Sequence, residues 1–333
     1  MAKITLDLDA LVAEGRLTKS EAERLASMAV TGRGLSTVVQ VLYILGALGL
    51  AGGVMALKPD PMTGMVLAAL ALGFAIATPA MKREDIALLG TAMGIAGTVG
   101  LAGSVGMQFG EILPPVAVNA IMTAIAFGAA LALRSRFLAA LVPLGLASLL
   151  GSSSEYWHAS YAIIVTEAAI TVMAFAALAG LLLLASLRLP QIWSAMATVA
   201  ARMSLLLMNF GFWVGSLWGD HIGDHFASRG NAWGSDWEAA EAFRQTAFFI
   251  PDWAFVAGWA AVSVAAIVFL HRYRFAVNAS ITFLAINVYT QFFEWFGDSA
   301  FIMLTGGVTL LAFAFGLYHF DRWMVARAKT AVA

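Results

Sequence analysis

The chain contains no cysteine and few charged residues. The absence of cysteine excludes disulfide bonds, thiolate metal sites and cysteine nucleophiles from this chain of 333 residues. Only 12% of the residues are charged and 61% are hydrophobic, whereas soluble domains have roughly 25% charged residues. With a mean hydropathy of +0.85, the chain has the composition of an integral membrane protein.

Motifs of soluble enzymes are missing as well. The sequence has no G-x-x-x-x-G-K-[ST] phosphate loop, no H-E-x-x-H zinc motif and no G-x-S-x-G nucleophile turn. ATP-driven transport by this chain alone is therefore not expected. The net charge of -1 gives no electrostatic reason to expect nucleic acid as a partner.

Apolar runs bounded by charged or turn residues repeat along the chain. Most have the ~20 residues that an α-helix needs to cross the hydrocarbon core of a bilayer. The sequence therefore predicts an all-α integral membrane protein with about ten transmembrane helices. The predicted spans are residues 37–57, 61–81, 86–107, 114–133, 137–152, 159–186, 200–219, 247–270, 275–293 and 298–320.

The Lys and Arg residues indicate the orientation of these spans. If the N-terminus is cytoplasmic, every Lys and Arg except Lys58, Arg229 and Arg244 falls on the cytoplasmic side, where such residues gather. The opposite side is rich in Asp and Glu. We therefore expect both termini in the cytoplasm and an acidic outer face.

The first 36 residues are polar and predict a short cytoplasmic helical hairpin. Thr18 and Glu21 have the spacing of a capping box, which would begin the second helix of the hairpin. This hairpin is a candidate for docking a partner protein. The alternative is that it only lies on the membrane surface.

The rest of the chain divides by composition. Residues 37–322 form the predicted ten-span domain, and residues 323–333 form a basic cytoplasmic tail. Within the ten-span domain the sequence is glycine-rich over 37–152 and aromatic-rich over 159–320, with an outer acidic loop over 220–246.

Polar residues of the predicted spans fall at helical spacing. On span nine, four such residues are separated by 4, 3 and 4 positions, so they share one helical face that reaches the outer surface. These four residues are Asn287, Gln291, Glu294 and Asp298. Asn209 lies on a second polar face, on span seven, with Arg202, Ser216 and Asp220.

Glu167 is the one carboxylate that the predicted spans place well inside the bilayer. It lies eight residues into span 159–186, which corresponds to a depth of about 12 Å. Asn287 and Thr305 lie at the same depth in later spans. The sequence thus predicts an outward-opening polar pocket lined by Glu167, Asn287, Gln291, Glu294, Asp298, Thr305 and Asn209. The alternative is that these groups only form hydrogen bonds between helices.

The acidic loop contains two Asp-His pairs four residues apart. Carboxylate and imidazole groups are ligands for zinc and other divalent ions. The candidate metal ligands are Asp220, His221, Asp224 and His225. Gly219 and Gly223 favour a loop at this place, so a solvated acidic loop is the alternative. No other cofactor is expected.

Both ends of the chain resemble a known family. The chain opens with Leu11-Val12-Ala13-Glu14-Gly15-Arg16-Leu17-Thr18, then Glu21-Ala22-Glu23-Arg24-Leu25, then a glycine-rich run from Leu45-Gly46-Ala47. Its other end contains Tyr289 to Phe293, Ser299-Ala300-Phe301-Ile302 and Gly306-Gly307 before the basic tail. These segments are similar to the bacterial predicted-membrane-protein family catalogued as domain of unknown function 2157. Where such proteins often have a tryptophan and an asparagine after the first span, this chain has Lys58-Pro59-Asp60-Pro61. The resemblance implies a bacterial inner (cytoplasmic) membrane location and no particular activity.

Three classes of function agree with these features. A permeation or transport protein would use the polar pocket as its path for an ion or small polar solute. A non-catalytic scaffold or accessory subunit would use the N-terminal hairpin and the aromatic half as docking surfaces. A metal-dependent membrane enzyme would use the Asp-His run. We favour permeation or transport first, the scaffold or accessory subunit second and the enzyme last, with membrane lipids, a second copy of the chain or a membrane-complex subunit as expected partners.

Overall fold

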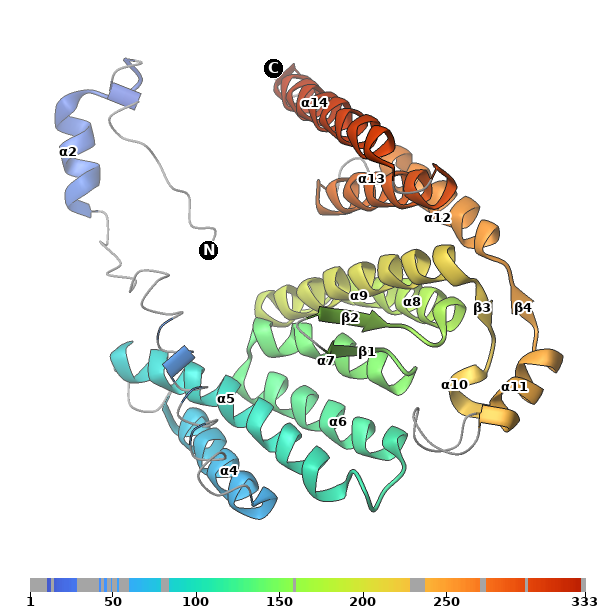
Figure 1. Cartoon of the computed structure of the whole chain (residues 1–333). Helices are drawn as coiled ribbons and strands as arrows, with labels where there is room; N and C mark the ends of the chain where they lie inside the picture. The colour runs from blue at the N-terminus through green and yellow to red at the C-terminus, as the bar shows by residue number, and fades with distance from the viewer. Residues whose placement is uncertain are drawn as a thin grey trace. The chain divides into compact units, whose positions relative to one another are not determined.

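The computed structural model describes residues 11–12, 15–28, 42, 45–46, 49, 53, 60–78, 84–157, 160–227, 237–269, 274–296 and 299–330. These residues are mainly helical, as the sequence predicts, and two short antiparallel strand pairs interrupt the helices. The chain divides into two units, Met1–Gly46 and Ala47–Ala333, which are described separately (Figure 1).

The N-terminal unit contains helix α2 (Lys19–Met28). The Thr18 hydroxyl and backbone N–H donate to Glu21 Oε2 at 2.7 and 2.9 Å, and the Glu21 N–H donates to the Thr18 hydroxyl at 3.3 Å. These bonds satisfy backbone groups that a helix start leaves unpaired. The predicted capping box is therefore confirmed, whereas the first helix of the predicted hairpin lies mostly outside the described residues.

The second unit contains eleven helices whose bounds lie within the described residues. In chain order they are α4 (Pro61–Ala77), α5 (Glu84–Phe109), α6 (Pro115–Leu133), α7 (Arg136–Leu149), α8 (Ala168–Ser186), α9 (Gln191–Trp218), α10 (Asp224–Ala227), α11 (Trp237–Thr246), α12 (Asp252–Phe269), α13 (Arg274–Phe296) and α14 (Ala300–Thr330). Strands β1 (Ser153–Trp157) and β2 (Ser160–Ile164) pair before α8, and β3 (Asp220–His221) pairs with β4 (Phe249–Ile250).

Five helical segments in the described part of the chain are long and apolar enough to cross a membrane, by length and composition. They are Leu89–Phe109, Pro115–Leu133, Ala168–Ser186, Gln191–Trp218 and Asp252–Phe269. The segments Pro61–Ala77, Arg136–Leu149 and Phe301–Gly316 are also apolar but shorter.

Three predicted spans differ from the helices at their starts. The predicted span 247–270 begins with strand β4, and helix α12 starts only at Asp252. Residues 160–164 of the predicted span 159–186 form strand β2, and helix α8 begins only at Ala168. The run Tyr161 to Val165 is aromatic and β-branched, which suits a strand as well as a helix, and it pairs with β1 through the Tyr156–Tyr161 register. Helix α9 begins at Gln191, ahead of the predicted start at 200.

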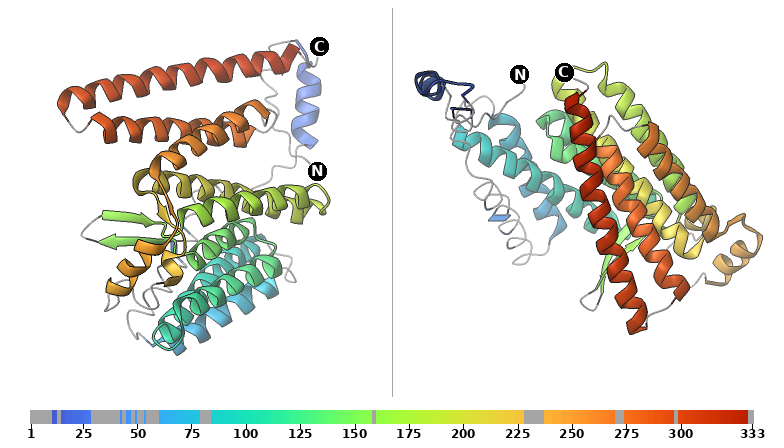
Figure 2. Two further views of the ribbon diagram at one scale, coloured as in Figure 1. Left: turned by 90° about the vertical axis from the view of Figure 1, so that its right-hand side faces the viewer. Right: turned by 90° about the horizontal axis from the view of Figure 1, so that it is seen from above.

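Helices that follow one another along the chain pack together. Contacts join α4 to α5, α5 to α6, α6 to α7, α8 to α9 and α12 to α13, and α13 lies beside α14 (Figure 2). Glycine allows the α4–α5 contact to be close, because a Cβ at Gly97 would lie 2.9 Å from the carbonyl oxygen of Ala68. Helix α9 also packs against α7 and α12, and so contacts helices that come both before and after it in the chain.

An aromatic core joins α8, α9, α12 and α13. It includes Phe175, Phe212, Trp259 and Phe283, one from each helix. The Trp259 side chain is fully buried, and its ring is parallel to that of Phe212 with 6.3 Å between the ring centroids. This core fixes the four helices whose ends and interfaces carry the polar groups described next.

Candidate functional site

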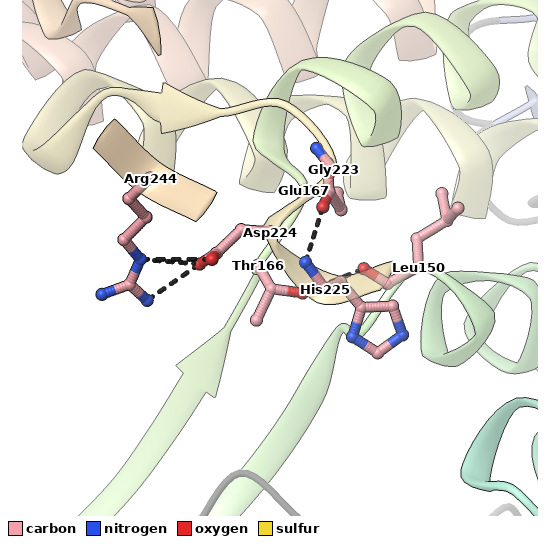
Figure 3. A network of polar contacts seen from close by, with 7 residues as sticks. All are labelled: Leu150, Thr166, Glu167, Gly223, Asp224, His225 and Arg244. Atoms are coloured by element: carbon pink, nitrogen blue, oxygen red, sulfur yellow. Dashed lines mark hydrogen bonds and ion pairs between the residues drawn. The ribbon is translucent and has the colours of Figure 1, made fainter. Parts of the chain in front are cut away.

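Glu167 is a completely buried carboxylate at the start of α8. It occupies the N-cap position of that helix but does not cap it. Its two oxygens instead accept hydrogen bonds from the backbone N–H groups of Gly223 and His225, at 2.9 and 2.8 Å (Figure 3). Glu167 therefore holds the turn in which the short helix α10 begins.

Asp220 joins the same two segments in the opposite sense, because it lies after α9 and binds the start of α8. It follows the end of α9, is 5% exposed, and its Oδ2 accepts a hydrogen bond of 2.8 Å from the Ala169 N–H in the first turn of α8. A carboxylate at this place satisfies a free N–H group and lies at the positive end of the α8 dipole. We call this arrangement the carboxylate clasp: Glu167 and Asp220 with the N–H groups of Ala169, Gly223 and His225.

Two further contacts fasten the segment that follows α9. The guanidinium of Arg244 on α11 donates to both oxygens of Asp224, with a shortest distance of 2.8 Å (Figure 3). The β3–β4 pair places His221 opposite Phe249, with 4.5 Å between the ring centroids. The clasp thus belongs to a folded segment and not to a solvated loop.

His225 packs against the end of α7. Gly151 there has a φ of +78°, and a Cβ at this position would lie 2.5 Å from His225 Nδ1. Only glycine fits both the backbone conformation and this close approach. The imidazole points away from the Glu167 carboxylate (Figure 3), and its buried Nε2 has no hydrogen-bond partner among the described residues.

Burial decides the electrostatics of the clasp. It raises the pKa of Glu167, a shift that the Gly223 and His225 N–H groups oppose and the charges of Asp220 and Asp224 reinforce. Burial likewise raises the pKa of Asp220, against the effect of the Ala169 N–H. The pKa of His225 is lowered, also by burial. All three groups lie outside the apolar helices.

We expect the raised pKa of Glu167 to make acid favour the folded clasp. A carboxyl group whose pKa is higher in the folded than in the unfolded chain binds more protons when folded, so its contribution to stability falls as the pH rises above its unfolded pKa of roughly 4. The unfolding temperature of the detergent-solubilised protein should therefore fall with pH relative to that of Glu167→Gln, which cannot titrate. A difference that stays constant from pH 4 to 8 would contradict this prediction.

The predicted pocket around Glu167 is wrong in its contacts. The expected neighbours Asn287, Gln291 and Thr305 do not supply the hydrogen bonds to Glu167, which come from residues 223 and 225. The depth was counted along a helix starting at residue 159, whereas β2 occupies the first part of the predicted span and Glu167 lies at the start of α8. Thr305 bonds to carbonyl groups of its own helix, Glu294 is exposed, and Asp298 lies outside the described residues.

The predicted metal ligands have separate partners. Asp220 binds the start of α8, Asp224 binds Arg244, His221 lies beside Phe249, and His225 is packed at Gly151. In the part of the chain that the structure describes, no group of three or more His, Asp or Glu side chains is placed to hold a metal ion. A divalent ion at Asp220, His221, Asp224 and His225 stays a prediction, and binding would require these contacts to rearrange.

A second set of polar contacts lies where α9 meets α13. Trp213 Nε1 donates to Thr290 Oγ1 at 3.1 Å, and Gln291 Nε2 donates to the Ser216 carbonyl at 3.2 Å. Near the other end, the Arg202 guanidinium lies 5.0 Å from the Phe275 ring centroid. Because the paired residues keep an almost constant separation along the chain, α9 and α13 run parallel.

Asn209 of α9 and Asn287 of α13 are also polar and almost fully buried, with exposures of 5% and 3%. The Asn209 amide donates to the Leu205 carbonyl and accepts from Trp259 Nε1 of α12 at 2.8 Å. Asn287 lies one turn before Gln291 on α13. We call this set the polar seam: Asn209, Trp213, Ser216, Asn287, Thr290 and Gln291.

The helical spacing of Asn209 and Ser216 and of Asn287 and Gln291 was the sequence signal for the seam. Trp213 falls four residues after Asn209, so the same spacing could have found it. Trp259 could not be found in this way, because an apolar helix with two tryptophans does not reveal which indole N–H meets an amide.

A comparison with protein-family models, curated proteins and solved structures found no match to this chain. The family resemblance of its two ends therefore stays a prediction.

Proposed function

We propose that this chain is a multi-pass protein of a bacterial inner membrane that lets an ion or small polar solute pass along the polar seam. The proposed topology has ten spans, with both termini in the cytoplasm. Five long apolar helices and the bias of Lys and Arg toward one side support this topology. In it, the carboxylate clasp lies on the outer side.

The observation that carries the proposal is the burial of uncharged polar side chains between apolar helices. Asn209 and Asn287 are almost fully buried beside the aromatic core, and the seam ends near Ser216, four residues before Asp220 of the clasp. Polar side chains inside the membrane are costly, and they mark the paths of ions and substrates in membrane proteins. The seam and the clasp together supply polar groups from mid-helix to the end of α9.

A flux measurement on reconstituted protein tests the proposal. We expect purified protein in liposomes to increase the flux of at least one ion or small polar solute over that of empty liposomes. Gln291→Leu removes the donor to Ser216 and should reduce this flux about tenfold, which corresponds to ~1.4 kcal/mol. Tyr289→Leu changes an exposed residue of the same helix and should leave the flux unchanged. Equal leakage of loaded and empty liposomes would contradict the proposal.

The separate N-terminal unit favours a second candidate function. Residues Met1–Gly46 form a unit of their own, and α2 is polar with an exposed Leu25. A scaffold or accessory subunit would use such a unit to bind another subunit. Co-purification of a stoichiometric membrane protein, lost on deletion of residues 1–36 and unaffected by Gln291→Leu, would support this function over permeation.

A further inference from the structure

One buried acceptor in the polar seam has no donor. The Oδ1 atom of Asn287 is fully buried and receives no hydrogen bond from any described residue, and the whole side chain is 3% exposed. A buried carbonyl oxygen without a donor costs about 1–3 kcal/mol. Such an atom is better accommodated where a ligand brings positive charge or an N–H group.

The surroundings of Asn287 are aromatic on one side and polar on the other. One turn earlier on α13 lies Phe283, whose ring contacts those of Phe210 and Trp259, with centroid distances of 5.7 and 6.3 Å. One turn later lies Gln291, which binds the Ser216 carbonyl. Both the oxygen and the electron-rich faces of aromatic rings attract cations.

Positive side chains are scarce near this position. Helices α8, α9, α12 and α13 contain no Lys, and their Arg residues are Arg202 and Arg274. Arg274 begins α13 and Arg202 lies over Phe275, so both are remote from Asn287 along the helices. At the clasp end, Arg244 is bound to Asp224. An anion in the seam would meet no positive partner on these helices, while the carboxylates Glu167 and Asp220 lie at the start of α8 and just after the end of α9.

The oxygens of the seam are neutral, which favours a bound cation of low charge. Divalent ions such as Ca²⁺ and Mg²⁺ are usually held by carboxylates, and the carboxylates of Glu167 and Asp220 already accept backbone hydrogen bonds. Neutral carbonyl oxygens coordinate monovalent cations in membrane channels. We propose that the permeating species is a small monovalent cation and that Asn287 Oδ1 is one of its ligands. This inference rests on the proposed function and narrows it.

Cation binding can be measured on the solubilised protein. With ionic strength held constant by choline chloride, KCl or NaCl should raise the unfolding temperature of the wild type, because a ligand that binds only the folded chain stabilises it. The increase should disappear in Asn287→Leu and persist in Asn278→Leu, which changes an exposed asparagine of the same helix. Asn287→Asp places a negative charge at the same position and should enlarge the increase, because the charge attracts the cation more strongly. If Asn287→Leu does not fold, a response of Asn287→Asp equal to that of the wild type would overturn the assignment. An equal response of wild type and Asn287→Leu would overturn the assignment of Asn287.

Ion flux separates this inference from the proposed function. Proteoliposomes should pass K⁺ or Na⁺, with a flux about tenfold lower in Asn287→Leu and unchanged in Asn278→Leu. Flux of chloride or of a neutral solute without cation flux would overturn the inference and leave the proposed function standing. The absence of any flux would overturn the proposed function as well.

Discussion

Replacing Glu167 with alanine should destabilise the protein more than any exposed substitution in the same region. The change leaves the buried N–H groups of Gly223 and His225 without an acceptor, at a cost of about 1–3 kcal/mol for each. Thermal unfolding of the detergent-solubilised protein measures this loss. The matched control is Glu241→Ala, because Glu241 is an exposed carboxylate on α11.

Glu167→Gln distinguishes the loss of the acceptors from the loss of the charge. The amide keeps one oxygen that accepts a hydrogen bond, so this variant should be much less destabilised than Glu167→Ala at acidic pH, where the raised pKa of Glu167 favours the neutral carboxyl. If Glu167→Ala unfolds at the same temperature as Glu241→Ala, the clasp does not contribute to stability.

Trp259→Ala should be as disruptive as the loss of the clasp or more so. Trp259 is fully buried, stacks on Phe212 and donates to Asn209. Truncation of a buried Trp to Ala costs about 3–5 kcal/mol, because it leaves a cavity and removes apolar contacts. Here it also leaves Asn209 Oδ1 without its donor. Unfolding in increasing urea or with temperature, followed by tryptophan fluorescence, measures the change.

Two variants control this second prediction. Trp253→Ala changes a tryptophan of the same helix that is 68% exposed, so it should have little effect on stability. Trp259→Phe keeps most of the ring contacts and loses the hydrogen bond to Asn209, for an expected cost of about 1 kcal/mol. A loss in Trp259→Ala no larger than in Trp253→Ala would show that the aromatic core does not hold the four helices together.

The apolar runs predicted the helices because helix length and composition are local properties of a membrane sequence. Each predicted span from residue 61 onward contains a helix. Two of these spans begin with a strand. In the span 159–186 this arises because Tyr161 to Val165 continues the apolar run, and an apolar run of this length fits a strand or a helix equally. The strand pairing with residues 153–157 is a contact between two segments, which hydropathy does not detect.

The sequence predicted polar faces better than polar partners. Spacing alone placed Asn209 with Ser216 and Asn287 with Gln291, and the Gln291–Ser216 hydrogen bond joins these two faces. The partners of Glu167 could not be predicted, because they are backbone N–H groups that every residue offers. The Asp-His run was read as a shared site, but the end of β3 and the turn before α10 separate Asp220 from Asp224, and Arg244 lies on another helix.

The clasp also determines the order in which this part of the chain can be completed during synthesis. The residues that bind each other are 51, 56 and 58 positions apart. When the first turn of α8 has been synthesised, neither Asp220 nor the turn at Gly223 has been made, so the start of α8 has no cap and Glu167 has none of its native hydrogen-bond donors. Only after α9 and the next few residues have been added can the two carboxylates exchange water for backbone N–H groups. Closure of the clasp therefore marks the moment at which α8 and α9 become a finished helical hairpin.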